Sequence, residues 1–239
     1  MEIIGYIALI GIGMVLALTG GGGSLLSVPI LVYLFSLDVV IASSYSLFIV
    51  GTTSLIGAWL KQKDHRIDIR SGIIFSACSV IAIFSTRRWI VPAIPDEVLV
   101  YDDVALTKRV LILAVFALLA IASSLAILLK RGYNSHQDQP RLKLLAPVGF
   151  GTGILVGFVG AGGGFLILPT LSFFARLPFK IALGTTLLII GMNSLLGFVG
   201  DVLNYEIDWS FLILITTLAL TGMVIGNSYI TRIPIQRLR

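Results

Sequence analysis

Long stretches without a charged side chain constrain this chain more than any other feature of its sequence. No charged residue occurs from Ile3 to Phe35, and a bilayer-spanning helix needs roughly 20 consecutive apolar residues. The runs that meet this requirement are Ile3–Phe35, Val39–Leu60, Val110–Leu129, Leu144–Ala175, Ile181–Gly200 and Trp209–Ile230. The stretch Ser71–Pro92 qualifies only if Arg87 and Arg88 lie at its end. The sequence therefore predicts an all-α, polytopic transmembrane helix bundle.

The composition agrees with a protein that spends most of its length in lipid. Hydrophobic residues make up 57% of the chain and charged residues 12%, with a mean hydropathy of +1.02, whereas soluble domains are about 25% charged. The net charge of +5 suits cytoplasmic loops rich in Lys and Arg and requires no nucleic-acid partner. The first apolar run has neither the basic start nor the cleavage site of a secretory signal peptide, so we expect it to remain in the membrane.

The stretch Thr19–Pro29, TGGGGSLLSVP, places glycines where a membrane helix should run. A glycine inside a helix costs about 1 kcal/mol relative to alanine, so four in a row favour a break. The backbone groups freed by the break cannot face lipid. A half-helix that begins after the glycines would present N–H groups and a positive dipole end, which can bind an anion, with Ser24 as N-cap. The alternative is that the glycines serve only close helix packing.

A second copy of this block follows at an offset of 140 residues, which superimposes Gly20 on Gly160. Matched residues include two glycine clusters, two prolines and two aspartates: Gly20, Gly22, Gly23, Pro29, Ile41, Gly51, Ser54, Gly57 and Asp68 with Gly160, Gly162, Gly163, Pro169, Ile181, Gly191, Ser194, Gly197 and Asp208. We expect two homologous transmembrane repeats, 1–129 and 144–239, joined by a cytoplasmic linker, 130–143. We expect the final helix of the second repeat to be absent, because the sequence stops at ITRIPIQRLR, where that helix should begin. The chain is therefore either a fragment or a protein that does without that helix.

The charges of equivalent loops indicate that the repeats are inverted. Lys61–Arg70 contains four basic and two acidic residues, and its counterpart Asp201–Asp208 contains no basic and three acidic residues. Because basic loops stay in the cytoplasm, the two loops should lie on opposite sides of the membrane. By the same rule 130–143 is cytoplasmic, and 95–107 is external.

This assignment requires the run Leu144–Ala175 to enter and leave on one side, as a hairpin broken at its glycines. Interrupted helices in inverted repeats are a known transporter architecture. Arg87 and Arg88 do not fit easily, because they would fall near the outer face. Either they form a basic vestibule there, or the boundary of that segment is misplaced.

The candidate substrate-binding residues form two groups. The first would supply backbone donors at the two breaks: Gly22, Gly23, Ser24, Gly162, Gly163 and Gly164. The second would supply side-chain hydrogen bonds: Thr52, Thr53, Asn193 and Ser194. Hydroxyls of this kind could instead bond their own helix backbone, and Asn193 could make either an interhelical bond or a substrate contact. No Asp, Glu, Lys or His lies deep within a predicted span, which argues against a proton pump and favours an anionic or neutral substrate.

Enzyme and metal motifs are missing from the sequence. GGGGS is not followed by the Lys-Ser/Thr of a phosphate-binding loop, and neither glycine block completes a dinucleotide-binding fingerprint. There is no histidine-bearing catalytic constellation and no cluster of thiols or carboxylates for a metal. We expect no enzyme activity, no metal site and no cofactor.

The paired blocks GGGGSLLSVPIL and GAGGGFLILPTL, with the segments that follow them, resemble the TauE/SafE family of membrane transporters, often called sulfite exporters. The resemblance covers nearly the whole chain. It implies a multi-pass permease of a bacterial or archaeal inner (cytoplasmic) membrane that moves sulfite, an organosulfonate or another small sulfur-containing anion by alternating access. A passive anion channel and a non-transporting scaffold subunit remain alternatives. The expected partners are lipid and a small anion, and the sequence leaves open whether the chain forms a homo-oligomer.

Overall fold

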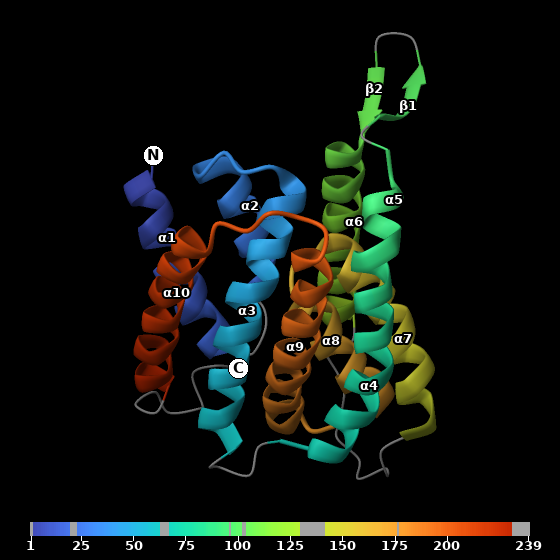
Figure 1. Cartoon of the computed structure of the whole chain (residues 1–239). Coiled ribbons are helices and arrows are strands. Elements are labelled where there is room, and N and C mark those ends of the chain that lie inside the picture. The colour runs from blue at the N-terminus through green and yellow to red at the C-terminus, as the bar shows by residue number, and fades with distance from the viewer. Residues whose placement is uncertain are drawn as a thin grey trace.

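The computed structural model describes residues 2–19, 23–62, 67–95, 97–101, 104–129, 142–175 and 177–230. Within them the chain consists of helices, one antiparallel hairpin and short connecting turns (Figure 1). The elements are α1 (Glu2–Thr19), α2 (Ser24–Leu34), α3 (Val39–Gln62), α4 (Ile69–Ser85), the π-helical turn η1 (Thr86–Ile90), α5 (Val91–Ala93), β1 (Glu97–Tyr101), β2 (Val104–Thr107), α6 (Lys108–Leu129), α7 (Leu142–Val159), α8 (Gly164–Thr170), the π-helical turn η2 (Leu171–Ala175), α9 (Phe179–Val202) and α10 (Trp209–Ile230).

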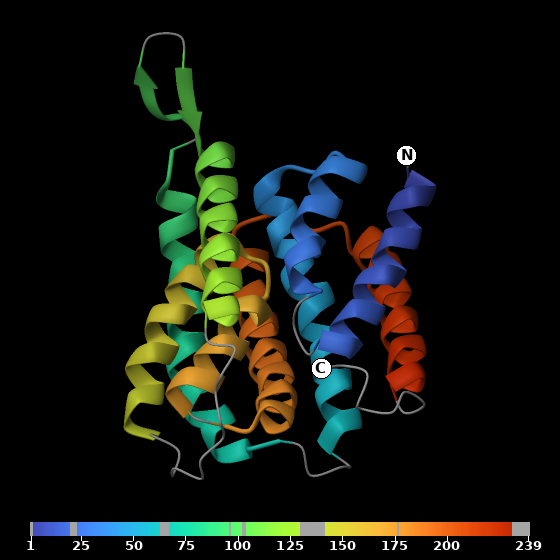
Figure 2. The ribbon, with the colours of Figure 1, turned by 180° about the vertical axis from the view of Figure 1, so that it is seen from behind.

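Five helical segments of the described residues are long and apolar enough to cross a membrane. They are Val39–Gln62, Ile69–Ala93, Lys108–Leu125, Ile181–Val202 and Trp209–Ser228. The outer surface of the bundle is apolar as well: Leu118 and Ile121 of α6 are each 68% exposed, and α6 lies at the outside of the bundle (Figure 2). These lengths and this surface identify a multi-pass membrane protein, as the sequence predicted.

The two remaining apolar runs are each divided into two helices that are not among the five long candidate spans. The run Leu144–Ala175 breaks between α7 and α8, where Gly160, Gly162 and Gly163 have φ values of 73°, 69° and 71°. These left-handed conformations suit glycine and few other residues. The first run likewise divides into α1 and α2, although residues 20–22 lie outside the described part of the chain. The predicted interruption of both runs is therefore confirmed.

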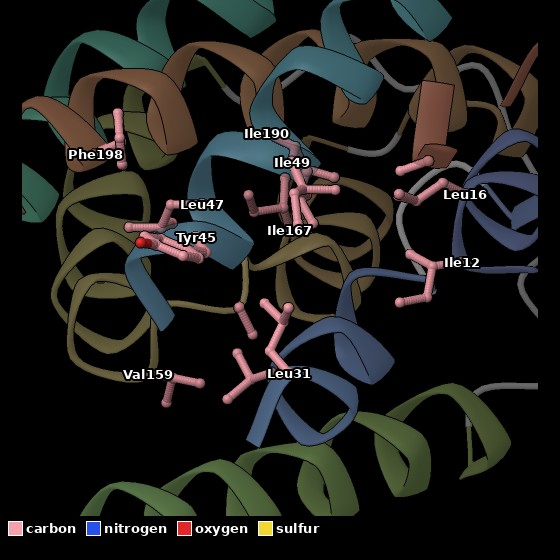
Figure 3. Packing of buried hydrophobic residues seen from close by; sticks show 14 of the residues in the cluster. Ile12, Leu16, Leu31, Tyr45, Leu47, Ile49, Val159, Ile167, Ile190 and Phe198 are labelled. Carbon is pink, nitrogen blue, oxygen red and sulfur yellow. The ribbon is translucent and has the colours of Figure 1, made fainter. Parts of the chain in front are cut away.

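The interior is built on α3 and α9, which pack along one another. Ile49 of α3, Ile190 of α9 and Ile167 of α8 meet in the buried core (Figure 3). Around this pair, α1 packs along α10, and α4 packs along α7 and α9. Glycines make some of these approaches close: a Cβ built on Gly153 would lie 2.5 Å from the carbonyl oxygen of Ser79. Small residues let membrane helices approach in this way.

The two interrupted pairs open toward opposite ends of the bundle. The outer ends of α1 and α2 lie at the end that carries the β1–β2 hairpin, and those of α7 and η2 lie at the other end (Figure 1). The long helices α3 and α9 also run in opposite directions between those two ends (Figures 1 and 2).

Two hydrogen bonds join residues whose sequence positions differ pairwise by the offset of 140. The Tyr45 hydroxyl accepts a hydrogen bond from the Asp208 N–H at 2.9 Å. At the equivalent positions, the Thr185 hydroxyl accepts one from the Asp68 N–H, also at 2.9 Å. These two hydrogen bonds link α3 to the segment before α10 and α9 to the segment before α4.

Candidate functional site

The α7–α8 turn, Gly160–Gly163, is buried and surrounded by polar side chains from three other elements. A Cβ built on Gly160 would overlap the Arg87 guanidinium from η1 and lie 2.5 Å from Cβ of Ser43 in α3. A Cβ built on Gly162 would lie 3.2 Å from the Ser194 hydroxyl of α9. Glycine thus allows a cationic side chain and a hydroxyl to reach the backbone of the broken helix.

Arg87 forms a fully buried ion pair with Asp201. Its Nη1 lies 3.1 Å from Oδ2 of Asp201, and both side chains are 0% exposed. The same Nη1 donates to the Ser43 hydroxyl at 2.9 Å. Each charge neutralises the other, and this offsets part of the large cost of removing either one from water.

The structure corrects one boundary and refines another. Asp201 was assigned to an acidic loop, whereas it lies in the last turn of α9, which ends at Val202, and is buried. Arg87 lies in the last part of its helical segment, which continues through η1 and α5 to Ala93, and its side chain is buried and does not line an open vestibule. The available signal was the pair of opposite charges at the margins of two apolar runs, since an ionisable residue in a membrane segment usually has a partner.

The guanidinium has hydrogen-bonding capacity that the ion pair does not use. Nε and Nη2 of Arg87 have no partner among the described residues, and neither does Oδ1 of Asp201. Buried polar atoms are almost always hydrogen-bonded in folded proteins. Nη2 is therefore a donor beside the helix break, and neither Nη2 nor Nε has an acceptor among the described residues.

Arg87 lies in a π-helical turn that is tied to the end of α9. The side-chain amide of Asn204 donates to the carbonyl oxygens of Arg87 and Arg88, each at 3.3 Å, and to that of Gly200 at 3.2 Å. Its Oδ1 accepts from the Arg88 guanidinium. Single π-helical turns occur frequently at functional sites, and here the turn directs two adjacent arginines to different partners.

Within the described residues, the glycines predicted to bind substrate, and Ser24, lie at helix ends and close contacts between helices. Gly22 lies outside the described residues. Gly23, rather than Ser24, holds the N-cap position of α2, and a Cβ there would lie 2.8 Å from the Ile12 carbonyl oxygen of α1. Gly163 caps α8 in the left-handed conformation and packs against Val156, and Gly164 begins that helix. Close packing and backbone conformation both require glycine at position 163.

The predicted polar side chains separate into two groups. Thr52 and Thr53 donate to carbonyl oxygens of their own helix, those of Phe48 at 2.8 Å and Ile49 at 2.6 Å respectively. The Asn193 Oδ1 accepts from the Ser79 hydroxyl of α4 at 2.8 Å, so Asn193 makes an interhelical bond. Nδ2 of Asn193 and the hydroxyl of Ser194 have no partner among the described residues and are buried.

The chemistry of the turn is that of a donor-rich, buried site. The described residues contain no group of three His, Cys, Asp or Glu side chains that could hold a metal ion. A pocket elsewhere, between α3, α4 and α9, is open and apolar and is lined by Leu55, Trp59, Ile73 and Leu188. That pocket offers hydrophobic contact and little polar recognition.

Comparisons with known proteins agree with this architecture. The family profile described as "Sulfite exporter TauE/SafE" matches residues 5–239. A "Probable membrane transporter protein" of Xylella fastidiosa is 29% identical over 231 residues, which cover 92% of this chain and 82% of the relative. The "Probable membrane transporter protein YdhB" of Bacillus subtilis is 24% identical over 223 residues, 93% of this chain and 88% of the relative. A similarly named protein of Methanocaldococcus jannaschii is 28% identical over 205 residues, 82% of this chain and 69% of the relative. No solved structure matches the chain significantly.

The matched family consists of membrane transporters, not enzymes, and the match extends over nearly the whole chain. It agrees with the spans, the interrupted helices and the apolar exterior described above. The chain therefore belongs to the sulfite exporter TauE/SafE family.

Proposed function

We propose that this protein is a permease that moves a small anion across the cytoplasmic membrane by alternating access. The observation that carries the proposal is the α7–α8 turn, a broken helix buried in protein and faced by unpaired donors such as the Ser194 hydroxyl. Irregular backbone at membrane depth is tolerated only where it is buried in protein or lines a wet cavity. Transporters place substrate sites at such breaks.

A sulfur oxyanion or organosulfonate is the substrate that we favour. Its three oxygens would accept hydrogen bonds from backbone N–H groups of Gly22, Gly23 and Gly162–Gly164, and from the side chains of Ser24, Asn193 and Ser194. Thr52 and Thr53 would contribute after releasing their bonds to α3. The description of the matching family as sulfite exporters supports this class.

We further propose that residues 1–129 and 144–239 are homologous repeats of inverted orientation, joined by a cytoplasmic linker, 130–143. Two hydrogen bonds support this arrangement: Tyr45 accepts from the Asp208 N–H, and Thr185 accepts from the Asp68 N–H. Tyr45 and Thr185 are 140 residues apart in sequence, and so are Asp68 and Asp208. So does the opposite opening of the two interrupted helix pairs (Figure 1). Exchange between two such related conformations is the usual basis of alternating access in inverted-repeat transporters.

Flux through reconstituted vesicles tests the transport proposal. Purified protein in liposomes should carry sulfite or methanesulfonate with saturable kinetics, and an excess of unlabelled anion on the far side should accelerate exchange. Flux that does not saturate and shows no counterflow would instead support the passive channel. Absence of flux for every anion of the panel, from protein that is folded in the liposomes, would contradict transport and favour the scaffold alternative.

Ser194 permits a mild test of the site. Ser194→Ala removes an unpaired buried hydroxyl without adding volume, and we expect KM for the anion to rise several-fold while the protein remains folded. Thr216→Val is the matched control, because the Thr216 hydroxyl donates to the Leu212 carbonyl oxygen of its own helix at 2.7 Å. Equal KM values in the two variants would remove Ser194 from the site.

Cysteine labelling tests the orientation of the repeats. In a Cys78→Ser background, single cysteines at the exposed positions Gln62 and Glu206 should react with an impermeant maleimide from opposite sides of the membrane. Labelling of both positions from the same side would contradict the inverted arrangement.

A further inference from the structure

We propose that Arg87 is the anion-binding residue of this transporter and that it holds an oxyanion through Nε and Nη2, beside the backbone of Gly160. The inference rests on the proposed anion transport and assigns its central binding group. The ligand class is an anion with at least two oxygens on one centre, such as a sulfonate, a sulfite or a carboxylate.

The geometry of the guanidinium carries this assignment. Nη1 faces Asp201 and Ser43, while Nε and Nη2 have no partner among the described residues. Nε and Nη2 form the side edge of the guanidinium, where two N–H bonds point in nearly the same direction. That edge binds two oxygens of one oxyanion at once, a bidentate geometry that arginine supports and lysine does not.

The surroundings of that edge favour a ligand rather than another side chain. A Cβ built on Gly160 would overlap Nη2, so this end of the edge reaches the broken backbone that follows α7. Arg87 is 0% exposed, and in so dry a site a charged hydrogen bond is much stronger than in water. An unpaired guanidinium edge is correspondingly costly unless an acceptor occupies it.

Asp201 has a defined part in this arrangement. By binding Nη1 alone, it holds the guanidinium plane in place and leaves the side edge without a hydrogen-bond partner among the described residues. Its negative charge also opposes an incoming anion, which keeps binding reversible. We therefore assign Asp201 as a positioning residue that lowers anion affinity, and Arg87 as the residue that contacts the anion.

A purely structural ion pair would not explain why Nε and Nη2 of Arg87 lack partners among the described residues. Such a pair accounts for Nη1 and for Oδ2 of Asp201, but it leaves two donors of the same guanidinium unused in a buried position. Arg88, the next residue of the same π-helical turn, has its guanidinium bonded to Asn204. Arg88 is therefore a matched control of identical chemistry.

The test measures anion binding to the purified, full-length protein in detergent, without requiring transport. Thermal unfolding is followed while sodium methanesulfonate or sodium sulfite is titrated at constant ionic strength, with chloride as the reference anion. Arg87→Lys keeps a cation opposite Asp201 but removes the bidentate edge, so the apparent Kd should rise roughly tenfold or more. Arg88→Lys should leave the Kd within about twofold of the unmodified protein. Asp201→Asn, whose amide oxygen can still accept from Nη1, should lower the Kd.

Two results would overturn the assignment. One is an unchanged Kd in Arg87→Lys. The other is a Kd that rises equally in Arg87→Lys and Asp201→Asn, which would indicate a structural pair whose loss merely loosens the bundle.

The transport assay separates this inference from the proposed function. If the unmodified protein carries sulfite or methanesulfonate and Arg87→Lys retains the same KM, transport stands and the Arg87 assignment fails. If no anion is carried but binding depends on Arg87 as described, the binding site stands and the transport proposal fails.

Discussion

Breaking the buried pair of Arg87 and Asp201 should be among the most destabilising single changes in this chain. The two charged atoms lie 3.1 Å apart with no exposure of either side chain. At an effective dielectric constant of about 20, Coulomb's law gives an attraction of about 5 kcal/mol at this separation. Removing one partner of such a pair typically costs about 3–5 kcal/mol, because the other charge remains buried without compensation.

We expect Asp201→Leu and Arg87→Met to lower the free energy of unfolding by amounts in that range. The double variant should lose much less than the sum, because it buries neither charge, and replacing both partners of a buried pair by apolar residues is often neutral. Unfolding by SDS titration of detergent-solubilised protein, followed by circular dichroism, would give the four values of the cycle. Arg88→Met serves as the control, since its guanidinium bonds an amide and not a carboxylate.

Additivity of the single variants tests whether the two charges are coupled. Independent sites add to within about 0.5 kcal/mol. If the double variant costs the sum of the single variants within that margin, the two charges are not coupled and the account of the pair is wrong.

Two further predictions concern packing and the relation between the halves. Tyr45→Phe and Thr185→Val each remove the acceptor of one partly buried backbone N–H, so each should lower the free energy of unfolding by about 0.5–1.5 kcal/mol, the net contribution of a typical hydrogen bond; a large difference between the two would contradict their equivalence. Gly13→Ala should destabilise by about 1–3 kcal/mol, because its Cβ would overlap the Ala219 carbonyl group of α10. The matched change Gly11→Ala, where a Cβ would meet nothing within 4 Å, should be neutral or stabilise by up to about 1 kcal/mol, and thermal unfolding in detergent would compare the two.

The candidate site illustrates which residues a sequence can identify. Gly162 and Ser194 were expected at a substrate site, and the structure brings them to the same buried turn. Thr52 and Thr53 were expected there too, but their hydroxyls are bonded within α3, a choice between helix backbone and ligand that composition cannot resolve. Arg87 was placed near the outer face by the trace of loop charges, and the sequence did not indicate that Asp201 would be its buried partner.

The sequence by itself determined the membrane class, the two interrupted helices, the repeated blocks and the resemblance to a transporter family. These features are local or periodic: a bilayer requires long apolar runs, and glycine clusters weaken a helix wherever they occur. Only the tertiary structure decided that Arg87 and Asp201, 114 residues apart, form one buried pair next to Gly160. The reason is that a buried charge is stable only in the presence of its partner, and the packing of α4 against α7 and α9 is what brings the partner and the broken backbone together.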